Sequence, residues 1–239
     1  MINTNVNDYL SKNKIKFGII IGLDYVADKE RKLKGCINDT FLIIKLLIEN
    51  FNYEPENITL FTDHTKIKAT KENIFKKFNE YLNIKNNIDT ILFYFSGHGN
   101  NNCIYLENNE ILFDYEVKIN LINNLEQNTK IICILDCCKS GNFFRIGNWF
   151  SNYRIYENNV KLLLISACNN NESATEFYNK YNSVTFGLFT FYFVKLLYKF
   201  KNYIWKDLIE LLNIFIKKKN NQEAQLKYIN YDIVKNIDL

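Results

Sequence analysis

Two stretches of the sequence each end an apolar run in a turn that carries a reactive side chain. Residues 89–99 read D-T-I-L-F-Y-F-S-G-H-G, and residues 130–141 read K-I-I-C-I-L-D-C-C-K-S-G. An apolar run that stops at small residues is typical of a buried strand. One turn presents an imidazole and the other a thiol, the base and the nucleophile of acyl transfer. The two turns therefore predict the site of a cysteine hydrolase.

The chain has two histidines, and the second is the stronger candidate base. His64 lies in the polar segment T-D-H-T and is expected to face solvent. His98 lies between two glycines, which allow backbone groups to approach a ligand closely. A histidine in a tight turn without a catalytic role is the alternative. The strand end and the matching cysteine turn favour a general base.

The candidate nucleophile is one of two neighbouring cysteines. Cys137 and Cys138 point in different directions, so at most one of them can face His98. Cys133, in mid-strand, is expected to be a buried apolar residue. Cys138 follows the apolar run and precedes Lys139, where a cation and a helix amino end would both lower the thiol pKa. These features favour Cys138 and leave Cys137 as the alternative.

Backbone donors and two carboxylates complete the candidate site. The N–H groups of Gly99 and Cys138 are the natural donors to a tetrahedral oxyanion. Asp39 and Asp136 each have two interpretations, as a cap of the following helix or turn or as a carboxylate of the substrate pocket. Two carboxylates near the thiol would favour a substrate with a cationic group.

The rest of the chain alternates strands with helices. The apolar pattern predicts strands at 16–22, 57–61, 89–95, 130–136 and 160–165, a hairpin at 103–113, and helices ending near Phe51 and Leu82 and at 116–125, 186–200 and 205–218. Residues 142–159 and 169–182 are expected to be irregular, and the last twenty residues an extended tail. This order predicts an α/β fold with a mostly parallel sheet, in which ligands bind at the carboxyl ends of the strands.

Composition excludes several other classes of protein. The chain has 239 residues, 47% of them hydrophobic, which is ample for a core, and its 30 basic and 26 acidic residues give a mild net charge of +4. No basic cluster predicts a nucleic-acid partner. The amino terminus lacks a signal-peptide pattern, and the most apolar run, 186–198, is too short to span a membrane. Three of the six cysteines crowd one predicted strand and its end (Cys133, Cys137, Cys138), and the other three are scattered (Cys36, Cys103, Cys168). This spacing suggests no disulfide framework, so a soluble cytoplasmic protein is expected.

Four segments in order resemble the caspase-like peptidases, and most closely the metacaspases. They are F-G-I-I-I-G with L-K-G-C-I-N-D at 17–22 and 33–39, F-S-G-H-G at 95–99, D-C-C-K-S-G at 136–141, and S-A-C with F-G-L-F-T at 166–168 and 186–190. The resemblance implies the caspase–haemoglobinase fold, a three-layer α/β sandwich with a mostly parallel six-stranded central sheet. It implies a polar arm at 1–15 and one domain at 16–239, divided into a large-subunit-like region (16–141), a linker loop (142–159) and a small-subunit-like region (160–239).

The resemblance also implies roles for individual residues. His98 would be the general base and Cys138 the nucleophile. The pocket for the residue before the scissile bond would be walled by Cys36, Asp39, Ser96 and Asp136, and would prefer Arg or Lys. Ser166 and Ala167 would pair with the substrate backbone as an edge strand. The family typically acts as a monomer on protein or peptide substrates.

Three positions depart from the family pattern. Lys139 stands where the family usually has histidine, and Asn170 stands where an acidic residue is common, with Glu176 as a substitute. The chemistry needs no cofactor, but many members need calcium. Only Asp114 matches a calcium ligand, and Arg145 lies near where another is expected, which speaks against calcium dependence. Self-cleavage sites would be Arg145, Arg154 and Lys161.

The leading hypothesis is a cysteine endopeptidase that cleaves after Arg or Lys. The alternative from another class is a catalytically silent caspase-like scaffold that acts through a binding partner. A nucleotide-binding protein is disfavoured, because the sequence has no G-x-G-x-x-G or G-x-x-x-x-G-K-[ST] match.

Overall fold

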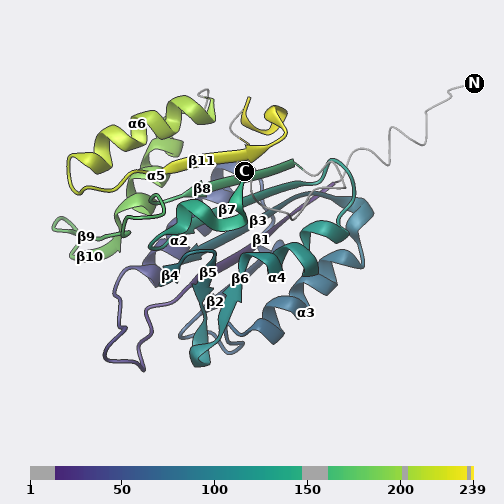
Figure 1. Cartoon of the computed structure of the whole chain (residues 1–239), viewed down its shortest axis with the longest axis horizontal. Helices are drawn as coiled ribbons and strands as arrows, with labels where there is room; N and C mark the ends of the chain where they lie inside the picture. Colours follow the sequence, from purple (N-terminus) through teal and green to yellow (C-terminus); the bar gives the residue numbers. More distant parts are fainter. Residues whose placement is uncertain (1–13, 147–160, 201–203, 236–237) are drawn as a thin grey trace, which may run out of the picture.

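The computed structural model describes residues 14–146, 161–200, 204–235 and 238–239 of an α/β protein. A six-stranded sheet runs through it in the order β11-β8-β7-β3-β1-β2 (Figure 1). Its strands are β1 (Ile15–Gly22), β2 (Ile58–Thr62), β3 (Ile88–Ser96), β7 (Lys130–Asp136), β8 (Lys161–Ser166) and β11 (Gln225–Ile229). All neighbours pair in parallel except β11, which runs antiparallel to β8. The expected α/β fold with a mostly parallel sheet is confirmed. Residues 1–13 of the predicted arm and 147–159 of the predicted linker lie outside the described residues.

Helices cover both faces of the sheet. They are α2 (Cys36–Phe51), α3 (Lys71–Leu82), α4 (Asp114–Asn120), α5 (Leu188–Lys199) and α6 (Trp205–Lys217). Helix α3 begins after Thr70, whose side chain caps it by accepting a hydrogen bond from the Asn73 N–H at 3.3 Å. Of the helices described, none combines the length and apolarity that crossing a bilayer requires.

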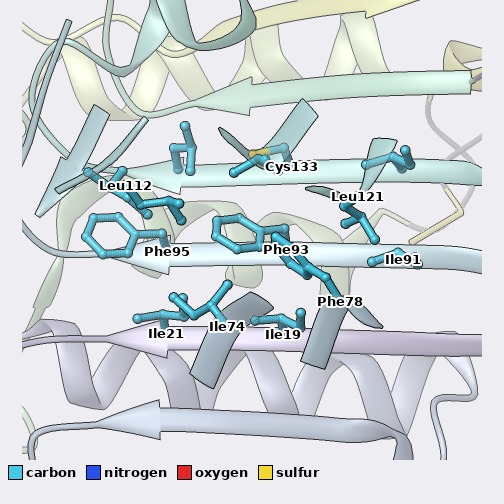
Figure 2. Close-up of a cluster of buried hydrophobic side chains, with 14 of the residues drawn as sticks. Ile19, Ile21, Ile74, Phe78, Ile91, Phe93, Phe95, Leu112, Leu121 and Cys133 are labelled. Carbon is cyan, nitrogen blue, oxygen red and sulfur yellow. The ribbon is translucent and has the colours of Figure 1, made fainter. Parts of the chain in front are cut away.

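Alternate residues of each strand belong to different cores. In β3, Ile91, Phe93 and Phe95 face a core that includes residues of α3 and α4, and Cys133 of β7 lies in the same core (Figure 2). Leu92 and Tyr94 face the other core, which packs against α2, α5 and α6. This period of two is the geometry of an extended strand buried on both faces. The result is a three-layer sandwich.

Short strands extend the carboxyl end of the sheet. The predicted hairpin at 103–113 is confirmed as β5 (Cys103–Tyr105) and β6 (Ile111–Phe113), preceded by β4 (Gly99–Asn100). A second hairpin, β9 (Glu176–Asn179) with β10 (Val184–Gly187), lies partly in the stretch expected to be irregular. The segment lacks apolar alternation, and its pairing is therefore visible only in the folded chain. The extended tail is confirmed in part, since 225–229 form β11.

Two predicted helix starts are wrong. Helix α2 begins at Cys36 with Gly35 as its N-cap residue and without a side-chain cap, so neither Asn38 nor Asp39 has the capping role considered for it. Helix α4 begins at Asp114, two residues earlier than predicted, and is followed by a short 3₁₀ turn at Ile122–Asn124. The Glu116 side chain closes the first turn of α4 by accepting the N–H of Phe113 at 2.9 Å.

The start of α2 is packed tightly against the end of β1. A Cβ added to Gly22 would lie 2.3 Å from Thr40 Cγ2 and 2.4 Å from the carbonyl oxygen of Cys36. The corresponding Cβ on Gly18 in the same strand would have only ordinary contacts, the nearest at 3.5 Å from Ile58. Glycine at 22 is therefore required for the close approach of strand and helix.

We predict that Gly22→Ala lowers the free energy of unfolding by about 1–3 kcal/mol, because the helix start must move to admit the methyl group. Gly18→Ala is the matched control and should be neutral or slightly stabilising, within about 1 kcal/mol. Urea unfolding of the three proteins measures both effects. Equal stabilities of the two variants would contradict this account of the packing.

Candidate active site

The two predicted turns meet because of the register between β3 and β7. Ser96 and Asp136 are directly paired as the last residues of neighbouring parallel strands. The turns stay together beyond the strands, since the Gly97 N–H donates to the Asp136 carbonyl at 3.2 Å. His98 and Cys138 are each the second residue after a paired position. The structure therefore brings the candidate base and nucleophile to neighbouring turns at one edge of the sheet.

The structure distinguishes the two neighbouring cysteines. Cys137 continues the strand alternation of Cys133, lies in the core and is only 2% exposed. Its Sγ would lie 2.5 Å from a Cβ on Gly99, so that glycine is needed for the two turns to touch. Burial raises the pKa of the Cys137 thiol well above its usual value. Cys138 is half-buried and accessible, which favours it as the reactive thiol.

The imidazole of His98 is oriented by a backbone carbonyl. Its Nε2 lies 2.7 Å from the carbonyl oxygen of Arg31. A carbonyl can only accept, so we assign the ring proton to Nε2, which leaves Nδ1 with the free lone pair. A neutral imidazole held in this tautomer is suited to accept a proton.

Tyr25 binds the backbone of the histidine turn and packs against the imidazole ring. Its hydroxyl accepts the His98 N–H at 3.0 Å and donates to the Tyr105 carbonyl at 2.7 Å, and its ring centroid lies 4.8 Å from that of His98. Burial raises the pKa of Tyr25, so it remains a neutral donor. Neither Tyr25 nor Arg31 was singled out from the sequence. The signal for Tyr25 was its place three residues after β1, at the same edge as the other two turns.

A pair of buried carboxylates lies next to the turns. Asp39 is fully buried, and it accepts hydrogen bonds from the Ser96 hydroxyl at 2.8 Å and the Gly187 N–H at 2.9 Å. Asp136 accepts the hydroxyl of Thr190 at 2.7 Å and its N–H at 3.1 Å. A Cβ on Gly187 would lie 2.1 Å from an Asp136 oxygen and 2.7 Å from an Asp39 oxygen. Neither carboxylate caps the helix or turn that follows it in the sequence; both instead accept N–H groups at the start of α5 (Leu188–Lys199). Their place in a substrate pocket stays a prediction.

The two carboxyl groups are hard to ionise together. Burial raises the pKa of Asp39 well above its usual value, and the charge of Asp136 raises it further. Burial likewise raises the pKa of Asp136 to about 6, against the lowering effect of the Thr190 hydrogen bonds. Like charges in a buried site favour a shared proton or an external cation. A positively charged group would therefore be bound in exchange for a proton.

Asp24, Cys36 and Glu176 form a cluster of side chains. One ligand atom each of Asp24, Cys36 and Glu176 lies within 4.8 Å of the others, the only such group among the residues described. Asp24 accepts the Cys36 N–H at 2.8 Å, and Glu176 accepts the N–H groups of Lys34 and Gly35, both at 2.6 Å. Burial raises the pKa of the Cys36 thiol. These carboxylates are thus engaged by backbone N–H groups of the protein itself.

The two residues that replace family amino acids lie at the nucleophile turn. Lys139 has a positive φ of 55°, and its N–H donates to the Glu172 carbonyl at 3.0 Å. Asn170 lies across from Gly141, since a Cβ on that glycine would be 3.3 Å from Asn170 Oδ1. Asn170 is therefore near the turn, whereas Glu176 belongs to the group around Asp24.

The predicted substrate edge at 166–167 is wrong. Ser166 is paired with Gln225 of β11 and is fully buried, as is Ala167. The Ala167 N–H donates to the Leu135 carbonyl at 2.8 Å, and its carbonyl accepts from Gln222 at 2.8 Å. The prediction treated β8 as an edge strand, but the tail of the chain adds β11 beside it. The backbone of these residues is consequently occupied.

The calcium ligand expected at Asp114 is already occupied by protein groups. The carboxylate accepts the Phe144 N–H at 3.1 Å, and its charge and that of the buried Lys118 ammonium influence each other. Asp114 belongs to no group of three or more metal-ligating side chains within the described part of the chain. A cation next to a single carboxylate is the opposite of a calcium site, which needs several oxygen ligands. Among the described residues, the surroundings of Asp114 therefore do not fit calcium.

The raised pKa of Asp136 predicts a pH dependence of stability. Between about pH 4 and pH 6 the native state binds a proton that the unfolded chain has released, so the free energy of unfolding falls as the pH rises. The shift corresponds to roughly 3 kcal/mol at most across this window. Asp136→Asn should flatten the profile, whereas Asp207→Asn on the exposed side of α6 should leave it unchanged. Urea unfolding from pH 4 to pH 7 measures it, and parallel profiles for wild type and Asp136→Asn would refute the assignment.

Known proteins share both the sequence motifs and the fold. A family model for the metacaspase peptidase C14 domain matches residues 16–146. Metacaspase-1A of Aspergillus oryzae is 30% identical over 142 residues, which are 52% of this chain and 34% of that protein. Metacaspase-4 of Arabidopsis thaliana is 25% identical over 142 residues, 53% of this chain and 34% of that protein. The chain thus aligns with about a third of the length of these two relatives.

A solved structure of a protein from Geobacter sulfurreducens has the same fold. Its TM-score is 0.67 at 13% identity, and the match covers 94% of this chain and 97% of that one. The family model takes in both turns, the start of α2 and more than half of the sequence. The chain therefore belongs to the metacaspase peptidase C14 family.

Proposed function

We propose that this protein is a cysteine endopeptidase that cleaves peptide bonds after Arg or Lys, with Cys138 as nucleophile and His98 as general base. The observation that carries the proposal is the pairing of Ser96 with Asp136, which brings an accessible thiol and an oriented imidazole to adjacent turns. Membership of a cysteine peptidase family supports the same chemistry.

The reaction follows from the groups at the two turns. His98 Nδ1 takes the Cys138 proton, and the thiolate attacks the substrate carbonyl to form a tetrahedral oxyanion. The N–H groups of Gly99 and Cys138 are our candidate donors to that oxyanion. As the carbon–nitrogen bond breaks, the imidazolium gives its proton to the leaving amine. Water, deprotonated by His98, then hydrolyses the thioester and regenerates the thiol.

The acidic pocket supports a basic residue before the scissile bond. Asp39 and Asp136 lie beside the histidine and cysteine turns, with Asp24 and Glu176 on the same side. A guanidinium or ammonium group would bring the cation that the carboxylate pair lacks and form charge-assisted hydrogen bonds. An acidic residue in this position would be repelled.

A catalytically silent scaffold that acts through a partner is the second candidate function. It is favoured by one observation, namely that the backbone of Ala167 is fully engaged and offers no edge for an extended substrate. It predicts that a thiol-directed peptide probe leaves the protein unlabelled.

The nucleophile is tested by comparing the two neighbouring cysteines. An Arg-containing peptide probe with a thiol-reactive group should label wild type and Cys137→Ala but not Cys138→Ala. Turnover of a fluorogenic Arg peptide should fall by roughly 10⁴-fold or more in Cys138→Ala, because no nucleophile remains. Equal turnover in wild type and Cys138→Ala would refute the proposal, and an unlabelled wild type would favour the scaffold.

The preference for a basic residue is tested at Asp39. In Asp39→Asn, kcat/KM for an Arg peptide should fall by about 100-fold, because a buried charge-assisted contact is lost. A peptide with neutral norleucine in that position should lose much less. Asp207→Asn is the control for a general effect of removing a carboxylate. A uniform decrease for both peptides would show that Asp39 supports the fold rather than specificity.

A further inference from the structure

Two buried side chains of opposite charge lie behind the turn that follows the candidate nucleophile. Asp114 and Lys118 are one helical turn apart on α4 and are 3% and 4% exposed. Burial of two charged side chains is costly and is tolerated only where each has specific partners. The Asp114 charge raises the pKa of Lys118 against the effect of burial, which nevertheless lowers it to about 8. Both residues lie away from the acidic pocket and have no part in the reaction proposed above.

Both side chains bind the backbone of a single residue. The Phe144 N–H donates to Asp114 Oδ2 at 3.1 Å, and the Phe144 carbonyl accepts from Lys118 Nζ at 3.0 Å. The Lys118 ammonium also lies 5.7 Å from the centroid of the Phe144 ring. The peptide group before Phe144 is therefore held by the Asp114 carboxylate, and the peptide group after it by the Lys118 ammonium.

The segment held in this way has an unfavourable backbone. Phe144 and Arg145 have φ values of 65° and 49°, in the left-handed region that residues with side chains avoid. Such a backbone conformation is unfavourable and persists only where its surroundings impose it. The contacts of Asp114 and Lys118 with Phe144 are such surroundings.

The same turn closely follows the candidate nucleophile. It spans Ser140–Arg145 and begins two residues after Cys138. Its first residues lie against Cys168, since a Cβ on Gly141 would be 2.9 Å from the Cys168 carbonyl oxygen. The turn is thus fixed against Cys168 at its start and against α4 at its end.

Positive charge dominates the end of the turn. The Arg145 guanidinium is near enough to lower the pKa of both Asp114 and Lys118. With its amide oxygen facing Arg145, Asn102 accepts from Arg145 Nε at 3.1 Å and Nη2 at 3.0 Å. Two cations therefore surround one carboxylate, and an added divalent cation would meet net repulsion.

We propose that Asp114 and Lys118, through their contacts with the backbone of Phe144, position the turn after Cys138 from within the protein and take the place of a bound divalent cation, so that neither the order of the turn nor peptide cleavage requires calcium. The part concerning cleavage rests on the endopeptidase function proposed above. The part concerning the turn does not. Asp114 and Lys118 are positioning residues in this proposal.

The test separates the order of the turn from activity. Hydrogen exchange at the Phe144 amide is measured in EDTA and in calcium for wild type, Lys118→Met, Asp114→Asn and the double variant. Lys206→Met, an exposed lysine on α6, is the matched control. The same five proteins are assayed on the fluorogenic Arg peptide under both conditions.

We expect equal protection of the wild-type amide in EDTA and calcium. Each single variant should exchange at least about tenfold faster at Phe144, because one buried charge is left without its partner. The double variant should be less affected than either single variant, for the same reason. Peptide turnover should fall by about 10- to 100-fold in the single variants, since a displaced turn misplaces the nucleophile, and calcium should not restore it.

Two results would overturn the proposal. One is calcium-dependent protection of Phe144 in wild type that Asp114→Asn abolishes, which would identify a metal site. The other is exchange in Lys118→Met that equals that of Lys206→Met. If the chain cleaves no peptide under any condition, the endopeptidase function fails, while the exchange rates still decide whether Asp114 and Lys118 hold the turn.

Discussion

The parallel register between β3 and β7 is the constraint on which the candidate site depends. It makes Ser96 and Asp136 neighbours, and each turn then needs only two more residues to present its reactive side chain. A slip of one residue would exchange the faces of a strand, because side chains alternate with a period of two. The apolar residues of β3 are buried on both faces, so a slip of one residue in either direction would place their side chains in the wrong core. Core packing therefore also sets the geometry of the site.

The same alternation divides the chemistry between the two faces. Cys137 lies on the same face as Cys133 and Leu135 and is buried in the core beside α3 and α4. Asp136 points to the opposite face, where α2 brings Asp39 and α5 brings Thr190. A buried carboxylate pair is tolerated there because backbone and hydroxyl donors satisfy its oxygens. As a result, the Cys137 thiol is buried on one face of the sheet, and the carboxyl groups of Asp39 and Asp136, with raised pKa values, are buried on the other.

Support for the two turns comes from elements distant in the sequence. Tyr25 and the Arg31 carbonyl hold the histidine turn from the loop after β1, and Asp114 and Lys118 hold the end of the cysteine turn from α4. Tyr25, Asp114 and Lys118 bind backbone atoms of the turns, whereas the Arg31 carbonyl binds the imidazole of His98 itself. Such contacts orient reactive groups at low cost in entropy, since both partners are already fixed by the fold.

Apolar runs and small-residue turns are local patterns, and they were sufficient to predict the parallel strands to within one residue, the order of strands and helices along the chain and the residues that could react. They also singled out Asp39 and Asp136 but left open whether these residues cap helices. The burial of Cys137, the pairing of β11 with Ser166 and the charge of Lys118 close to Asp114 became visible only in the folded chain. These outcomes depend on which segments pair across long stretches of chain. No local pattern of residues contains that information, because the partners are selected by packing and charge in the folded protein.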